Sequence, residues 1–311
     1  MPAGTSSRRA RARTLPRADP RPVLALVGPT GVGKSQLALT AARRLRAEIV
    51  AVDAFTVYRD MDVGTAKPSP DERAAVAHHM VDVLDPCQEC TVQWFQAAAR
   101  ASVADIVSRG RVPLLVGGSG LYFRAVVDPL EFPPTDRTVR AAVAARYPEA
   151  RSAHAALAAL DPAAAGRMEA ANFRRAVRAL EVIELTGRAF SDWRRAWDEY
   201  HSVYPGLRVV GVALPRDELV ARLDARVDAM VGRGLVPECR VLTGRTLSRS
   251  ARQAIGYAEV LDHLAGRLTL AEAVERMKVR TRRYAARQAR WFAADPRVQW
   301  KAPADVVPAL A

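Results

Sequence analysis

The sequence predicts an α/β fold in which a parallel sheet, flanked by helices, is interrupted by an all-helical subdomain. Up to about residue 133, short apolar runs alternate with segments of helical spacing, which is typical of a parallel sheet. Residues 134–204 show helical spacing and no convincing strand, and an apolar run resumes at 207–214. We therefore expect an α/β core at 22–133 and 205–311, with a helical insertion at 134–204.

The first strand leads into a glycine-rich phosphate loop. The apolar run 23–27 is followed by Gly28, Pro29, Thr30, Gly31, Val32, Gly33, Lys34 and Ser35. The pattern of glycine, four residues, glycine, lysine and a hydroxyl residue fits a P-loop, so the core is expected to be P-loop NTPase-like. Leu37, Ala41 and Leu45 then mark the buried face of the helix that the motif requires.

This loop predicts a site for a diphosphate or polyphosphate. Backbone N–H groups and the helix N-terminus attract an anion, Lys34 adds a point charge, and the Ser35 hydroxyl can ligate Mg²⁺. A glycine-rich turn without a ligand is the alternative, and it leaves the flanking strand and helix unexplained. The loop alone does not identify the phosphate compound.

Two further strand ends carry polar residues. A second strand at 48–53 ends in Asp53, and a strand at 112–116 runs into a second glycine loop that contains Ser119. Ligands bind beyond the carboxyl ends of parallel strands, so Asp53 is expected to face Lys34. The polar loop 54–68 between them could hold substrate or be a solvated connection. A short strand near 78–79 and a helix at 92–107 complete this half.

Arginines gather on two predicted helices. Arg174 and Arg178 lie one turn apart on a helix at 172–182 in the insertion. The last long helix carries Arg280, Arg283, Arg287 and Arg290 on one stripe, which favours a track for a polyanion. Beside it, Met277, Tyr284 and Trp291 recur every seven residues, and we interpret them as core contacts.

Composition favours a nucleic-acid partner. Lys and Arg number 47 against 33 Asp and Glu, a formal charge of +14. Basic side chains dominate affinity for nucleic-acid phosphates. A GC-rich genome, which favours Arg codons over Lys codons, is the alternative explanation of this excess. The first 21 residues carry six arginines and are predicted to be a disordered basic tail. No apolar run reaches the roughly twenty residues of a membrane helix.

Three cysteines indicate a reducing compartment, and we expect a cytoplasmic monomer. Cys87 and Cys90 form a single C-x-x-C pair. Zinc needs four ligands, and no second pair is present, so loop residues are the favoured interpretation.

Seven segments, in order, resemble one family. They are GPTGVGKS, DAFTVYRDMDVGTAKPS, HHMVDVLDP, LLVGGSGLY, RALEVIELTGR, AIGYAEVL and TRRYAARQARWF. Together they resemble the tRNA dimethylallyltransferases, also called tRNA isopentenyltransferases, from about residue 23 to 300. The family's reaction transfers a dimethylallyl group from dimethylallyl diphosphate to N6 of adenosine 37, in tRNAs that read codons beginning with U.

The resemblance implies a role for each site residue. Asp53 would be the general base, while Lys34, the loop amides and Mg²⁺ held through Ser35 would stabilise the leaving pyrophosphate. Thr30 and Ser119 would hydrogen-bond the diphosphate or the base, and Arg226 would be a second cation. The tRNA would contact the following residues of the loop, the insertion and the C-terminal helices: Asp53, Ala54, Phe55, Thr56, Arg174, Arg175, Ala176, Val177, Arg178, Arg252, Gln253, Gly256 and Tyr257. The insertion would clamp the anticodon arm.

The sequence departs from the family pattern next to the catalytic aspartate. Ala54 and Thr56 stand where serine and glutamine are usual, and Ser119 replaces a common threonine. Because Asp53 is present we expect activity, whereas the tRNA selectivity is open. Three other functions are weighed: a P-loop nucleotide kinase, a prenyltransferase acting on a free adenine nucleotide, and an inactive tRNA-binding protein. A kinase would leave GTAKP and GGSGLY unexplained, and the basic helices disfavour a free nucleotide.

Overall fold

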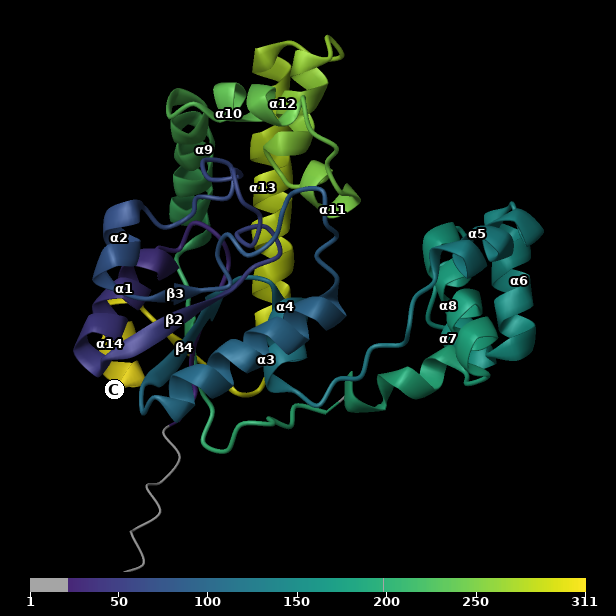
Figure 1. The fold of residues 1–311 in the computed structure, drawn as a ribbon, viewed down its shortest axis with the longest axis horizontal. Coiled ribbons are helices and arrows are strands. Elements are labelled where there is room, and N and C mark those ends of the chain that lie inside the picture. The colour runs from purple at the N-terminus through teal and green to yellow at the C-terminus, as the bar shows by residue number, and fades with distance from the viewer. Residues whose placement is uncertain (1–21, 198) are drawn as a thin grey trace, which may run out of the picture.

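Six parallel strands form one sheet in the order β3-β2-β4-β1-β5-β6 (Figure 1). The computed structural model of the protein describes residues 22–197 and 199–311, so the predicted tail at 1–21 lies outside the described residues. The strands are β1 Leu24–Val27, β2 Ala47–Val52, β3 His78–His79, β4 Val112–Gly117, β5 Arg208–Val212 and β6 Val298–Lys301. The predicted parallel α/β core is confirmed. Strand β6, which the sequence analysis did not predict among the C-terminal helices, closes the far edge of the sheet.

The register aligns three strand ends at one edge of the sheet. Gly117 of β4 pairs with both Val52 of β2 and Val27 of β1. Consequently Gly28, Asp53 and Gly118, each the next residue along the chain, leave the sheet at the same edge. All four β1 residues are buried, as expected for a central parallel strand covered on both faces.

Helices cover both faces of the sheet. Helices α1 and α14 pack on one face around Leu39 and Val306, and α3, α4 and α13 cover the other around Phe95, Phe123 and Phe292. The core helices are α1 Lys34–Leu45, α2 Pro70–Ala75, α3 Val92–Ser108, α4 Gly120–Val127, α9 Arg216–Gly232, α10 Leu235–Leu242, α11 Arg249–Arg252, α12 Tyr257–Leu264, α13 Leu270–Ala293 and α14 Pro303–Leu310. No helix of the described residues is long and apolar enough to cross a membrane.

The chain between α4 and β5 forms a separate helical unit that stands apart from the sheet in Figure 1. Its elements are α5 Arg137–Arg146, α6 Ala150–Leu160, α7 Pro162–Ala165, α8 Phe173–Thr186 and the 3₁₀ helix η1 Phe190–Trp197. They enclose their own apolar cluster, which includes Val143, Leu157 and Leu180. An independent core allows this unit to present a rigid surface to the sheet domain.

Two buried ion clusters fix the segments that connect the helical unit to the core. Arg124 of α4 binds Asp128 and donates to the backbone carbonyls of Trp197, at 2.6 Å, and Glu199, at 2.5 Å. In the helical unit, the buried carboxylate of Glu181 accepts hydrogen bonds from Arg140 and from the Asp136 backbone. Both connections are thus tied down by charge-assisted hydrogen bonds.

Candidate active site

The phosphate loop has the backbone conformation of an anion cradle. Gly33 adopts a φ of +90° in the left-handed region and leads directly into α1 at Lys34. At Gly28, with a φ of +142°, an added Cβ would lie 2.7 Å from the Val212 carbonyl oxygen, so a side chain does not fit. The loop therefore curls tightly between β1 and the N-terminus of α1, a backbone arrangement that suits an anion.

Among the described residues, Lys34 has no acidic hydrogen-bonding partner and is held by its own loop. Its Nζ donates to the carbonyl oxygens of Gly28, at 2.9 Å, and Pro29, at 2.7 Å. Burial, followed by the charge of Arg226, lowers the pKa of Lys34 to about 7, and Asp53 offsets part of this shift. A bound diphosphate would reverse the shift, because an adjacent anion favours the charged amine.

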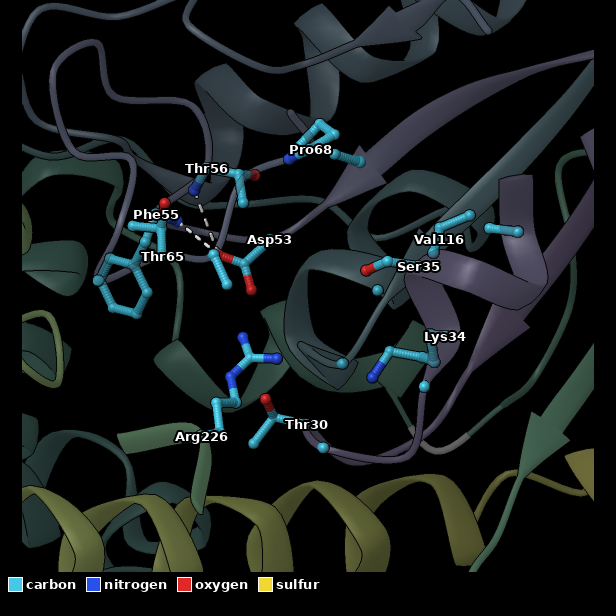
Figure 2. Close-up of a pocket in the computed structure, with 18 of the residues that line it drawn as sticks. Thr30, Lys34, Ser35, Asp53, Phe55, Thr56, Thr65, Pro68, Val116 and Arg226 are labelled. Carbon is cyan, nitrogen blue, oxygen red and sulfur yellow. Dashed lines mark hydrogen bonds between the residues drawn. The ribbon is translucent and has the colours of Figure 1, made fainter. Parts of the chain in front are cut away.

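Asp53 follows β2 directly and turns back on its own loop. Its Oδ1 accepts from the backbone N–H of Phe55, at 2.8 Å, and of Thr56, at 3.4 Å. Figure 2 shows the second carboxylate oxygen pointing toward the guanidinium of Arg226. This turn orients the carboxylate while leaving one oxygen to accept a proton.

Arg226 reaches the same space from α9. Burial lowers the pKa of its guanidinium, as does the nearby Arg233, and Asp53 opposes this effect. Figure 2 shows the guanidinium between Asp53 and Thr30. Lys34, Asp53 and Arg226 line a single cavity of about 430 Å³ together with Thr30 and Ser35. The structure thus brings the predicted carboxylate, the loop lysine and the second cation together.

The inner face of α13 forms a wall of this cavity that the sequence analysis did not predict. Met277, Thr281, Tyr284 and Gln288 all line it. Gln288 is buried, and its Oε1 accepts from the Thr30 backbone N–H at 2.8 Å. The spacing of four, three and four residues is a helical stripe that could have been recognised. The arginines of the same helix dominate its sequence pattern and obscure this stripe.

The donor set suits a magnesium ion that is held mainly by its substrate. The Ser35 hydroxyl lines the cavity next to Lys34, as Figure 2 shows. Across the described part of the chain, no group of three His, Cys, Asp or Glu side chains could hold a metal. Mg²⁺ typically takes one or two protein ligands plus phosphate oxygens and water, so a single hydroxyl next to a diphosphate site fits this ion.

Five residues predicted in the site lie outside the cavity lining: Ser119, Ala54 and, from the P-loop, Gly28, Pro29 and Val32. Gly117 and Gly118 line it, but Ser119, which caps α4 without a side-chain hydrogen bond, does not. Ala54 is likewise absent from the lining, whereas its neighbours Asp53 and Phe55 are present. Ser119 and Ala54 are thus not part of the cavity wall.

A second, larger cleft of about 1170 Å³ lies between the core and the helical unit. Its walls combine guanidinium groups with aromatic rings, which suits a polyanion with stacking surfaces. The cleft arginines are Arg137, Arg140, Arg174, Arg175, Arg178 and Arg249, and the cleft aromatics are Phe132, Phe190, Trp193, Trp197 and Trp291. Arg174 and Arg175 are exposed, whereas Arg178 is tied to the Pro133 and Pro134 carbonyls and to Glu181.

Four of the residues predicted to contact tRNA are buried, so the prediction of direct contact is wrong for them. Ala176 and Val177 pack inside the apolar cluster of the helical unit. Gly256 is buried, and Tyr257 has an exposed fraction of 0%. The Tyr257 hydroxyl donates to Glu238 at 2.6 Å. Arg252 and Gln253, one turn earlier, are exposed.

Glu238 explains why Tyr257 turns inward. This carboxylate also accepts from the backbone N–H groups of Asp62, at 2.9 Å, and Val63, at 2.8 Å. An acidic side chain from α10 thereby anchors the 62–64 segment, and an added Cβ at Gly64 would lie 2.4 Å from the Tyr257 ring. The aromatic residue supports the loop that lines the cavity.

The arginine stripe of α13 is only partly available to a ligand. Arg280 pairs with Glu259 of α12 and donates to the Gln253 carbonyl, so the prediction of an unneutralised track is wrong at this position. Arg283, Arg287 and Arg290 are exposed. The core interpretation of Trp291 is also wrong, since it is 39% exposed and lines the cleft.

The C-x-x-C pair is divided between surface and interior. Cys87 is exposed and lines the cleft, and Cys90 is buried. Both cysteines are free thiols, and the chain forms no disulfide among its described cysteines, Cys87, Cys90 and Cys239.

Comparison with known proteins identifies the family. A sequence model described as IPP transferase matches residues 56–295, and one described as isopentenyl transferase matches residues 21–82. The chain belongs to the IPP transferase family. The N-terminal match covers the P-loop and Asp53, and the longer match covers the cavity wall and both sides of the cleft.

Relatives and solved structures agree with this assignment along the chain. A tRNA dimethylallyltransferase from Kineococcus radiotolerans is 49% identical over 90% of this chain and 90% of its own length. One from Geobacillus thermodenitrificans is 41% identical over 89% of each. The crystal structure of the tRNA isopentenylpyrophosphate transferase from Bacillus halodurans has 38% identity and a TM-score of 0.67, covering 91% of this chain and 90% of that one. A eukaryotic dimethylallyltransferase acting on tRNA has 26% identity and a TM-score of 0.78, covering 91% of this IPP transferase and 74% of its own chain.

Proposed function

We propose that this IPP transferase is a tRNA dimethylallyltransferase. It transfers a dimethylallyl group from dimethylallyl diphosphate to N6 of adenosine 37, in tRNAs that read codons beginning with U. The names of its relatives support the reaction class, at identities up to 49%. The observation that carries the proposal is the single cavity shared by Asp53, Lys34 and Arg226.

The cavity supplies what a displacement at the allylic carbon requires. Adenine N6 is a weak nucleophile and loses a proton as its bond to carbon forms, and Asp53 is placed to accept that proton. As the carbon–oxygen bond breaks, charge grows on the pyrophosphate. Lys34, the P-loop amides and Arg226 are the cationic and dipolar groups at this cavity that would stabilise that charge. Thr30, which Gln288 holds through its backbone, lies beside Arg226.

Mg²⁺ is the proposed cofactor. Ser35 would hold it, and the ion would neutralise charge on the diphosphate. The protein contributes the cradle and the second cation, while the phosphate oxygens complete the coordination.

The large cleft is the proposed site for the tRNA anticodon stem-loop. Exposed Arg174 and Arg175 on α8 would contact backbone phosphates from one side, and Arg249 from the other. The acceptor adenine has to leave the loop stack to reach Asp53, which costs a few kcal/mol that the phosphate contacts offset. We expect the enzyme to act as a cytoplasmic monomer.

The test is a transfer assay with two donor and acceptor pairs. Purified protein is incubated with labelled dimethylallyl diphosphate and an anticodon stem-loop, or with labelled ATP and nucleosides. Prenylation at the adenosine next to the anticodon supports the proposal, and phosphate transfer without prenylation contradicts it. Adding AMP as a competing acceptor separates a free-nucleotide enzyme from one that requires RNA. Nucleoside mass analysis of tRNA from cells that lack this protein gives the same comparison in vivo.

A further inference from the structure

Thr56 carries a buried hydroxyl that no protein atom satisfies. Its side chain lines the active-site cavity, and within the described residues its Oγ1 has no hydrogen-bond partner. Buried polar side-chain atoms in folded proteins nearly always have a partner, because leaving one unpaired destabilises the fold. The only other such atom in the described part of the chain is Nε1 of Trp193, which lies in the cleft. Both therefore occur at surfaces where we propose that substrate binds.

The backbone around Thr56 is held on both sides. Its N–H donates to Asp53 Oδ1 at 3.4 Å, and its carbonyl accepts from the Asp82 N–H at 3.2 Å. Asp82 is itself fixed by ion pairs with Lys67 and Arg73, both at 2.5 Å. A β-branched side chain has few χ1 choices, so a fixed backbone also limits where its hydroxyl can go. The backbone that carries the unpaired Oγ1 is thus fixed to the carboxylate of Asp53, the proposed proton acceptor.

A second threonine on the same wall provides a comparison. Thr65 also lines the cavity, and its hydroxyl donates to the Met61 carbonyl at 2.5 Å. The surrounding loop can thus provide a hydrogen-bond acceptor for a threonine hydroxyl. Thr56 differs from Thr65 in that its buried hydroxyl has no partner among the described residues.

We propose that Thr56 Oγ1 hydrogen-bonds a ring nitrogen of the acceptor adenine while Asp53 accepts the N6 proton. This inference rests on the proposed function, because it requires adenine as the acceptor. Adenine has acceptor nitrogens, N1 and N7, on either side of the carbon that carries N6. A hydroxyl donor three residues from Asp53, on the same turn, can reach one of them when N6 faces the carboxylate. The donor diphosphate is served instead by Lys34 and Arg226, which come from other elements.

The test pairs two substitutions with two modified acceptors. Thr56→Val keeps the shape and removes the hydroxyl, and Thr56→Ser keeps the hydroxyl. Each variant is assayed on anticodon stem-loops that carry adenosine, 1-deazaadenosine or 7-deazaadenosine at the acceptor position, and its Tm is measured without substrate. Thr65→Val is the matched control, since it removes a satisfied hydroxyl from the same cavity.

We expect Thr56→Val to lower kcat/KM for the stem-loop about tenfold, with the KM for dimethylallyl diphosphate within twofold. One deaza substitution should cost the wild type about tenfold and Thr56→Val nothing further, because the lost hydrogen bond is the same. The Tm of Thr56→Val should stay equal or rise by about 2 °C, whereas that of Thr65→Val should fall. Thr56→Ser should retain the wild-type sensitivity to the deaza substitution.

Three results would overturn the inference: unchanged transfer by Thr56→Val, a loss confined to the KM for the diphosphate, or equal deaza sensitivity in wild type and Thr56→Val. A wild type that prenylates no stem-loop would instead reject the proposed function. The Tm comparison separates the two failures, because it needs no turnover.

Discussion

The active-site cavity and the cleft beside the helical unit differ in what builds them. The cavity is formed at aligned strand ends, where the backbone of the P-loop and the turn after β2 hold Lys34 and Asp53, the proposed catalytic groups. The cleft is formed by side chains from separate segments, with Arg174 on α8 facing Arg249 on α11. This difference predicts that substitutions in the cavity affect the chemical step, and substitutions in the cleft affect tRNA affinity.

The largest expected effect is that of Asp53→Ala. Removing the proton acceptor should lower kcat about 10³-fold, and tRNA affinity should stay within a few-fold. Single-turnover kinetics and filter binding measure the two quantities. Asp71→Ala, an exposed carboxylate on α2, is the control and should leave kcat unchanged. A comparable loss of tRNA affinity in Asp53→Ala would contradict the prediction that substitutions in the cavity affect only the chemical step.

A smaller effect is expected from the cleft. The double variant Arg174→Ala and Arg175→Ala should weaken tRNA binding about tenfold and reduce the salt slope of log K by about two, since two phosphate contacts are lost. The KM for dimethylallyl diphosphate should not change. Arg151→Ala, on α6 at the far side of the helical unit in Figure 1, is the control and should stay within twofold. An unchanged salt slope in the double variant would place the tRNA elsewhere.

Lys34 predicts that donor binding depends on pH. Its pKa of about 7 in the free protein lies below the ordinary value of 10.5, so above pH 7 the folded protein loses a proton that a bound diphosphate requires. Donor affinity should fall up to roughly tenfold per pH unit above 7, with uptake of up to one proton on binding near pH 8. Calorimetry in buffers of different ionisation enthalpy measures this uptake. Lys34→Arg, which stays charged, should abolish the dependence; equal uptake by both proteins would assign the proton to another group.

The same shift has a consequence for stability. The unfolded chain holds the Lys34 proton between pH 7 and 10.5, where the folded protein has released it, so this group makes stability rise with pH in that window. Removing the amine in Lys34→Met should flatten that part of the stability curve. Urea unfolding at several pH values checks the sign, and a decrease of stability with pH that disappears in Lys34→Met would contradict it.

The smallest effect is expected at Tyr257. Because its buried hydroxyl donates to Glu238 and does not face the cleft, Tyr257→Phe should cost about 1 kcal/mol of stability, or about 2–4 °C in Tm, and leave tRNA affinity unchanged. Thermal unfolding and filter binding give the two numbers. A tRNA affinity that falls tenfold without a change in Tm would restore Tyr257 as a direct contact.

The P-loop and Asp53 could be predicted as parts of one site because their sequence signals are local. A glycine pattern and a carboxylate after an apolar run predict Lys34 and Asp53 at one sheet edge, since parallel strands end together. Such local patterns do not predict Gln288, because its contact with Thr30 joins residues 258 positions apart. Only the packing of α13 against the loop brings them together.

The cleft was predicted less well for a physical reason. Motif residues identify a segment, but burial decides which side chains of that segment can touch a ligand. Arg174 and Val177 lie within one helical turn, yet one is exposed and the other is in the core of the helical unit. Tyr257 similarly lies in a basic segment and turns inward to an acidic partner that the sequence places nineteen residues away. Charge composition predicts that a basic surface exists, but it does not identify the residues that form that surface.

The most direct test of the central claim is a crystal structure with both substrates bound. The claim is that one cavity joins the proton acceptor to the phosphate cradle. With an anticodon stem-loop and a non-reacting thio analogue of dimethylallyl diphosphate, we expect the diphosphate on the P-loop at Lys34, and adenine N6 about 2.6–3.2 Å from the Asp53 carboxylate. A diphosphate bound away from Lys34, or an acceptor adenine that faces a group other than Asp53, would contradict the account.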